Sequence, residues 1–170
     1  HPAAILVNTG TPLQAYLMCF GLLTPQPASQ TIEQNNFLLY VPQDQLRGCG
    51  DFSSDIYALG MLLNQSFASR APYAASDPYT LAEQVMWGDF APFAADTEGI
   101  EGPQAQAISA ELDAIGAVVT NALQRDPKSR YANLSAMCAA LEPIAERLSP
   151  IQLGARLFES QQFDQAAAVL

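Results

Sequence analysis

The sequence predicts a mainly α-helical fold that opens with a short β-hairpin. Long stretches carry apolar residues at the three- and four-residue spacing of an amphipathic helix, whereas only the first part of the chain sets two short apolar runs around a turn signal. Of the 170 residues, 49% are hydrophobic and 14% are charged. Such a chain is long and apolar enough to bury its own core, which favours a globular domain and excludes intrinsic disorder.

The net charge of the chain narrows the choice of partners. Seventeen acidic residues against seven lysines and arginines give a net charge of −10. A chain without a basic stripe cannot neutralise the phosphates of DNA or RNA, and the same charge disfavours anionic membrane surfaces. No apolar run approaches the roughly 20 residues that span a bilayer. We therefore expect a soluble, cytoplasmic protein that binds neither nucleic acid nor membrane.

The cysteines and the single histidine argue against a metal site and against a nucleophilic enzyme. Cys19, Cys49 and Cys138 are too widely spaced for a disulfide framework or a zinc motif, and the only histidine is His1. A Cys/His or Ser/His catalytic pair would have to use that residue. We expect free, buried or half-buried thiols, with Cys19 as a small packed apolar residue.

The predicted hairpin lies at the start of the chain. The apolar residues 5–7 are followed by the turn signal Asn-Thr-Gly at 8–10 and by a second apolar run over 15–21. Residues 24–36 are rich in proline, glutamine, serine and asparagine and lack periodicity, which predicts a loop.

A first amphipathic helix is expected after residue 52. Ser53 and Ser54 are suitable N-cap residues for it. The apolar residues that follow share one helical face: Ile56, Leu59, Leu62, Leu63 and Phe67. The next segment, 71–108, contains four prolines, so we expect an irregular stretch with one helix over 80–87.

Two more apolar stripes predict the C-terminal helices. One stops at Asp126-Pro127 and consists of Leu112, Ile115, Val119 and Leu123. The other ends before Pro143 and consists of Leu134, Met137, Cys138 and Leu141. Because proline is favoured in the first turn of a helix, we expect Pro143 to start a separate helix.

Three motifs, taken in order, resemble the C-terminal lobe of a protein kinase. Residues 50–63 read G-D-F-S-S-D-I-Y-A-L-G-M-L-L and are similar to the start of the family's helix F, S-D-I-Y-x-L-G. Residues 40–48, Y-V-P-Q-D-Q-L-R-G, resemble Y-x-A-P-E-Q-L-x-G and put Asp44 at the glutamate. Residues 122–131, A-L-Q-R-D-P-K-S-R-Y, resemble A-L-x-x-D-P-x-x-R-Y/F. The resemblance covers residues 1–148 and implies a kinase-like C-lobe without the N-lobe.

The same resemblance implies that the catalytic machinery is degenerate. Residues 1–7, H-P-A-A-I-L-V, resemble the K-P-x-N-I-L-V of the catalytic loop and put His1 at the lysine and Ala4 at the magnesium-binding asparagine. The run C-F-G puts Cys19 at the aspartate of D-F-G. A methyl group cannot bind magnesium, and a thiol is a poor ligand for so hard a cation. The glycine-rich loop, a strand lysine and the catalytic aspartate are expected upstream of this chain.

The function implied is that of a pseudokinase, a scaffold or regulatory protein-interaction module with no catalytic, cofactor-binding or metal-binding residues. Two alternatives stay open. One is an active serine/threonine kinase that uses ATP and magnesium through other metal ligands. The other is a helical interaction module whose kinase ancestry no longer matters.

Three residues match positions with architectural roles in the family. Asp55 matches the helix F aspartate, which implies hydrogen bonds from the catalytic-loop backbone, and the alternative is a first-turn acid favoured by the helix dipole. Asp44 and Arg130 match a carboxylate and an arginine that form an ion pair, and the alternative is two unrelated surface charges.

An acidic window is predicted to form the partner surface. No lysine or arginine lies between Arg70 and Arg125, whereas eight acidic residues do: Asp77, Glu83, Asp89, Asp96, Glu98, Glu101, Glu111 and Asp113. We expect this surface to bind a basic segment of a protein partner, with Trp87, Phe90 and Phe93 as anchors where they are exposed. The alternative is a solvated acidic face with all three aromatic residues in the core.

The tail resembles a different family. Residues 154–166, G-A-R-L-F-E-S-Q-Q-F-D-Q-A, are similar to the first half of a tetratricopeptide repeat. A lone repeat cannot bury its apolar face, so this interpretation requires more repeats downstream. We therefore expect a kinase-like region over 1–148 and the start of a helical repeat region over 149–170. The alternative for the tail is an amphipathic helix packed on the lobe.

Overall fold

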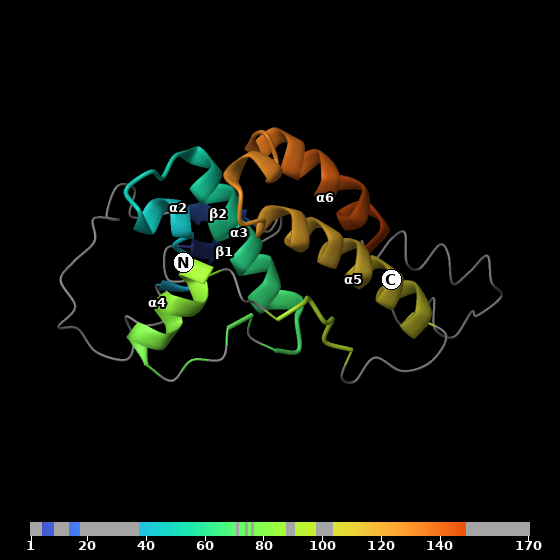
Figure 1. The fold of residues 1–170 in the computed structure, drawn as a ribbon. Coiled ribbons are helices and arrows are strands. Elements are labelled where there is room, and N and C mark those ends of the chain that lie inside the picture. The colour runs from blue at the N-terminus through green and yellow to red at the C-terminus, as the bar shows by residue number, and fades with distance from the viewer. Residues whose placement is uncertain are drawn as a thin grey trace.

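The computed structural model describes residues 5–8, 14–17, 38–70, 72–73, 75, 77–87, 91–97 and 104–148. Its elements are β1 (Ile5–Asn8), β2 (Gln14–Leu17), α2 (Gln43–Leu46), α3 (Phe52–Phe67), α4 (Pro78–Trp87), α5 (Gln104–Ala122), the 3-10 turn η2 (Pro127–Ser129) and α6 (Leu134–Leu148). The predicted mainly helical fold with a short N-terminal hairpin is confirmed (Figure 1). The predicted repeat region, 149–170, lies outside the described residues. None of the described helices combines the length and the hydropathy that crossing a membrane requires.

The hairpin is short and keeps apolar side chains in solvent. Strands β1 and β2 are antiparallel, with Ile5 opposite Leu17 and Asn8 opposite Gln14. Leu6 and Tyr16, which pair with each other, are both about half exposed. The predicted turn residues 9–10 and the run 18–21 lie outside the described residues.

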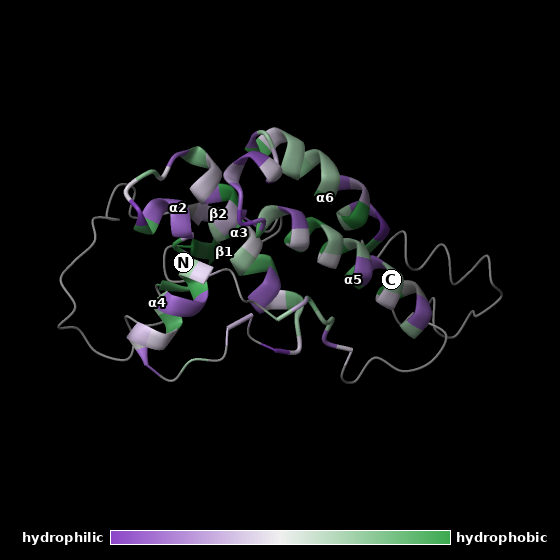
Figure 2. Ribbon diagram, viewed as in Figure 1, coloured by the Kyte–Doolittle hydropathy of each residue, from purple (hydrophilic) through white to green (hydrophobic). Residues whose placement is uncertain are grey.

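The core forms where α5 packs against both α3 and α6 (Figure 1). Ile56 and Met61 of α3 and Val119 of α5 are almost completely buried there. All four residues of the stripe predicted for α5 are buried, so that prediction is confirmed. Figure 2 shows hydrophobic and hydrophilic residues along the same helices, as expected of elements with one face in a core.

A glycine sets the distance between α3 and α5. A Cβ atom on Gly60 would lie 2.7 Å from the Cβ of Ala122, which is closer than two carbon atoms can approach. The backbone of α3 therefore packs directly against the side chains of Ala122 and Leu123 at this point. This contact is a physical reason for the glycine in the S-D-I-Y-x-L-G pattern.

The helix caps differ in part from those predicted. Helix α3 begins at Phe52, and its N-cap is Asp51, whose Oδ1 accepts a hydrogen bond from the backbone N–H of Ser53 at 2.7 Å. The hydrogen bonds from Ser53 hold the pKa of Asp51 below its usual value. The prediction that Ser53 or Ser54 caps this helix was wrong, because both side chains lie inside the first turn and are buried. Helix α4 begins at Pro78, two residues before the predicted start at 80.

The last helix corrects two further predictions. Helix α6 runs through Pro143 without a break, although a separate helix was expected there. Pro143 lies on the exposed face, and so does Ala139, whose carbonyl loses its helical partner to the proline and can bond to water instead. Leu134 and Cys138 belong to this exposed face and not to the core stripe. Cys49 is also exposed, so the expectation of buried or half-buried thiols was wrong for both cysteines described.

Candidate functional site

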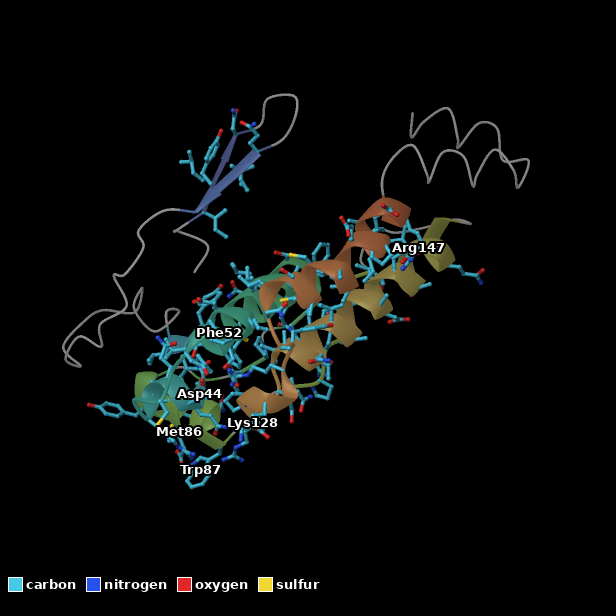
Figure 3. The ribbon with its side chains drawn as sticks, turned by 90° about the horizontal axis from the view of Figure 1, so that it is seen from above. Asp44, Phe52, Met86, Trp87, Lys128 and Arg147 are labelled. Carbon is cyan, nitrogen blue, oxygen red and sulfur yellow. The ribbon has the colours of Figure 1, made fainter. Side chains whose placement is uncertain are left out.

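The guanidinium of Arg130 donates hydrogen bonds to three separate segments of the fold. It follows η2 and is fully buried. Its Nη2 donates to Oδ1 of Asp44 at 2.7 Å, its Nη1 donates to the backbone carbonyl of Ser53 at 3.1 Å, and its Nε donates to the carbonyl of Gln124 at 2.8 Å. One side chain thus joins α2, the start of α3 and the segment that follows α5. Figure 3 labels Asp44 of α2, Phe52 at the start of α3 and Lys128 of η2.

The carboxylate of Asp44 is held from two sides. Besides Arg130, its Oδ2 accepts a hydrogen bond from the hydroxyl of Ser54 at 3.1 Å, and its own side chain is only 9% exposed. The sequence places Asp44 in the first turn of α2, where the helix dipole favours a negative charge. The backbone carbonyl of Asp44 also accepts from the N–H of Cys49, which fixes the turn after α2.

Two buried tyrosines lie against this ion pair. The guanidinium carbon of Arg130 lies 5.3 Å from the ring centre of Tyr57, within the range of a cation–π contact. The hydroxyl groups of Tyr57 and Tyr73 are 3.0 Å apart and share a hydrogen bond. Burial, together with the neighbouring Tyr73, holds the pKa of Tyr57 well above its usual value, and Arg130 acts in the opposite direction. Burial also raises the pKa of Tyr73, so both hydroxyls stay protonated at neutral pH.

A second arginine fastens α4 to the same centre. Gln43 and Arg125 share two hydrogen bonds: Gln43 Nε2 donates to the backbone carbonyl of Arg125 at 2.8 Å, and Arg125 Nε donates to Gln43 Oε1 at 2.9 Å. The two remaining nitrogens of Arg125 donate to the carbonyls of Trp87 and Met86, at 2.9 and 3.2 Å. A cation at these carbonyls complements the negative end of the α4 dipole.

The hydrogen bonds of Arg130 and Asp44 connect segments of the fold and leave neither side chain free to take part in a reaction. Every nitrogen of Arg130 has an acceptor, and both oxygens of Asp44 have donors. Over the ranges the structure describes, no three His, Cys, Asp or Glu side chains gather as a metal ion would need. Breaking the ion pair to free either group would leave a buried charge unpaired, so neither side chain is placed to act on a substrate.

Comparison with known proteins finds serine/threonine-protein kinases among the relatives of the chain. The chain is 30% identical over 146 residues to the serine/threonine-protein kinase PknB of Mycobacterium tuberculosis and 29% identical over 145 residues to PknB of Mycobacterium leprae. It is 31% identical over 134 residues to the serine/threonine-protein kinase PknL of Mycobacterium tuberculosis. No model of a protein family matches the chain. The chain is a distant homologue of serine/threonine protein kinases.

The homology covers most of this kinase-like chain but little of its relatives. The matches to PknB include 82% of the chain and 21% of PknB, and the match to PknL includes 76% of the chain and 31% of PknL. The chain therefore spans about a fifth of the length of PknB and about a third of the length of PknL. The resemblance drawn from the three motifs is confirmed at the level of protein-kinase-like homology.

The structure brings together two of the three architectural residues predicted for the kinase-like chain. Asp44 and Arg130 form the expected ion pair, although they are 86 residues apart in sequence. Asp55 lies apart from them, exposed in the first turn of α3, and has no hydrogen-bond or ion-pair partner among the described residues. Because residues 1–4 lie outside the described part of the chain, a bond from the catalytic-loop backbone to Asp55 stays a prediction. Ala4 and Cys19 lie outside it too.

The three aromatic candidates for a partner surface differ in exposure. Trp87 is 64% exposed at the end of α4. Phe93 is partly buried, and its ring fills the space beside Gly116 of α5, where a Cβ atom would lie 2.5 Å from the ring. Phe90 lies outside the described residues. Trp87 is therefore the one of these three with a ring shown to be available at the surface.

Sequence reasoning missed most of the partners around Arg130. Ser53 and Ser54 were expected to be helix caps, and Gln43 and Arg125 were given no role. Their positions within or beside the Asp44 and Arg130 motifs were the available signal. A glutamine and an arginine 82 residues apart give no sign in the sequence that their side chains meet.

Proposed function

We propose that this chain is a C-terminal lobe of kinase type that has lost phosphoryl transfer and serves as a scaffold or regulatory protein-interaction module. The observation that carries the proposal is a contrast. The buried Asp44–Arg130 pair, which holds the helices together, is present. The two positions that match the family's magnesium ligands carry Ala4 and Cys19.

The contacts that hold the helices in place are kept, whereas the side chains that would bind magnesium for phosphoryl transfer are replaced. In phosphoryl transfer the metal ions neutralise the charge that develops on the phosphate oxygens, and little covalent work is left for the protein. Without protein ligands for the metal, that stabilisation is lost. Each lost group of donors raises the activation free energy by several kcal/mol, which slows the reaction roughly a thousandfold. The contacts of Arg130 and Arg125 do not depend on a metal, so the surfaces of the helices keep their positions.

The expected result is an absence of magnesium-dependent phosphoryl transfer. The natural protein, incubated with γ-labelled ATP, magnesium and the generic substrates casein and myelin basic protein, should incorporate no more label than it does in excess EDTA. An active serine/threonine kinase assayed in parallel shows that the substrates and the label are competent.

The alternative function is favoured by one observation, namely that the relatives are themselves serine/threonine-protein kinases. Clear magnesium-dependent incorporation by the wild type, lost when Ala4→Arg places a bulky cation in the expected nucleotide cleft, would establish an active kinase with other metal ligands. Incorporation that survives Ala4→Arg would come from a contaminating kinase, and repurification must then remove it.

A further inference from the structure

Helix α4 has a face in solvent that carries two aromatic residues and an acidic one. We propose that this face of α4 docks a basic segment of a partner protein, one that presents arginine or lysine side chains. Three residues at four-residue spacing share the face: Tyr79, Glu83 and Trp87. The inference rests on the interaction role proposed above and adds the chemistry of the partner.

Two large aromatic rings are exposed on one side of α4, although the other side of this helix packs into the core. The side chains of Leu81 and Val85 place one side of α4 in the core. On the outer side Tyr79 is 78% exposed and Trp87 is 64% exposed. At 1.5 Å per residue the outer stripe is about 12 Å long, which suits a short peptide segment. Tyrosine and tryptophan are enriched among the few residues that dominate the binding energy of protein interfaces.

Hydrogen bonds hold both ends of α4 in place. At the N-terminal end, Oδ1 of Asp77 accepts from the backbone N–H groups of Tyr79 and Thr80, each at 3.0 Å. At the other end, Arg125 holds the carbonyls of Met86 and Trp87, and Gln43 holds Arg125. Figure 3 shows Trp87 at the edge of the molecule, at the same end as Asp44. Because the helix is already rigid, a partner that binds the two rings loses little free energy in ordering them.

The negative charge on the exposed face of α4 favours a basic partner. Glu83 is exposed, lies one turn of α4 from each of the two aromatic residues, and forms no ion pair with any residue that the structure describes. Arg125, which contacts the end of the same helix, already donates all three of its nitrogen groups to Gln43 and to the carbonyls of Met86 and Trp87. A partner guanidinium or ammonium group can rest on an aromatic face and pair with a carboxylate at the same time. A neutral apolar partner would bury Glu83 unpaired, and an acidic partner would be repelled.

The test uses Trp87 as its own reporter, because it is the only tryptophan in the chain. A random short-peptide library is selected in parallel against the chain and against its Trp87→Ala variant. Peptides that only the wild type retains should be rich in arginine and lysine. Titrating such a peptide into the wild-type chain should shift the tryptophan emission to shorter wavelength and protect it from acrylamide quenching, because the ring leaves water.

Two variants keep the reporter and remove other parts of the face. Tyr79→Ala and Glu83→Gln should each raise the peptide Kd by about tenfold or more, as expected for central interface residues. Matched controls are Tyr16→Ala, which removes another exposed ring, and Asp113→Asn, which neutralises another exposed acid. Both should change Kd by less than about twofold.

Several results would overturn the inference. It fails if the selected peptides carry no excess of basic residues, or if a peptide binds without changing the tryptophan emission. It fails equally if Asp113→Asn weakens binding as much as Glu83→Gln does, because the attraction would then be unspecific. Self-association in sedimentation that Trp87→Ala abolishes would assign the face to a second copy of the chain. None of these readouts involves phosphoryl transfer, so they leave the loss of activity to be judged separately.

Discussion

Replacing Arg130 with alanine is expected to lower the free energy of unfolding by about 3–5 kcal/mol, because it strands the buried Asp44 carboxylate and leaves several acceptors without donors. The measurement is the midpoint of urea unfolding followed by circular dichroism. Arg130→Lys should recover little of the loss, because an ammonium group cannot reach Asp44, Ser53 and Gln124 in the forked geometry of a guanidinium.

The control for this variant is Lys128→Ala, two residues earlier in η2 and exposed, which should change stability by less than about 0.5 kcal/mol. In the double variant Asp44→Asn with Arg130→Met, the loss should be smaller than the sum of the two single losses, since neither buried charge remains. A decrease in the free energy of unfolding of less than about 1 kcal/mol for Arg130→Ala would contradict this account of the ion pair, because removing a fully hydrogen-bonded buried charge destabilises a protein by more than that.

The second large effect is expected at the contact between α3 and α5. Gly60→Val should lower the free energy of unfolding by about 3 kcal/mol, because the new side chain would meet Ala122 and Leu123, both buried, and one of the helices must move. Thermal unfolding of the variant checks this expectation. Ser66→Ala, an exposed position on the same helix, is the matched control and should have little effect.

A compensating pair of substitutions makes the Gly60 prediction specific. If the cost comes from the clash of the new methyl group with the Ala122 side chain, Gly60→Ala combined with Ala122→Gly should be more stable than Gly60→Ala alone, because the methyl group has only changed sides. Equal stability of the single and the double variant would show that the contact at Ala122 does not limit the space at Gly60.

Local sequence patterns predicted the parts of the fold that depend on neighbouring residues. The stripe from Leu112 to Leu123 is buried as predicted because helical periodicity alone decides which face is apolar. The break expected at Pro143 did not occur, because tertiary packing of Met137 and Ile144 holds α6 together across a proline that faces water. The prediction that Leu134 belongs to the core was wrong, because helical periodicity does not indicate where the end of a helix extends beyond its neighbours.

The candidate site was predictable only where a motif carried it. The pairing of Asp44 with Arg130 followed from two patterns that resemble the kinase family, since nothing in their separation of 86 residues indicates a contact. The contacts of Gln43 with Arg125, and of Arg125 with the end of α4, depend on how three segments meet in space. Which of Trp87 and Phe93 reaches solvent was equally beyond the sequence, because the answer depends on the room left by Gly116.

We propose that the chain keeps the connecting contacts of a kinase-like lobe and has lost its magnesium ligands. Titrating ATP into the natural protein with and without magnesium decides whether this is so. The account predicts that magnesium does not tighten ATP binding by the wild type. In the double variant Ala4→Asn with Cys19→Asp, magnesium should tighten it by about tenfold or more, because two oxygen ligands are restored. Magnesium-dependent binding by the wild type itself would contradict the account, as would a folded double variant that responds to magnesium no more than the wild type does.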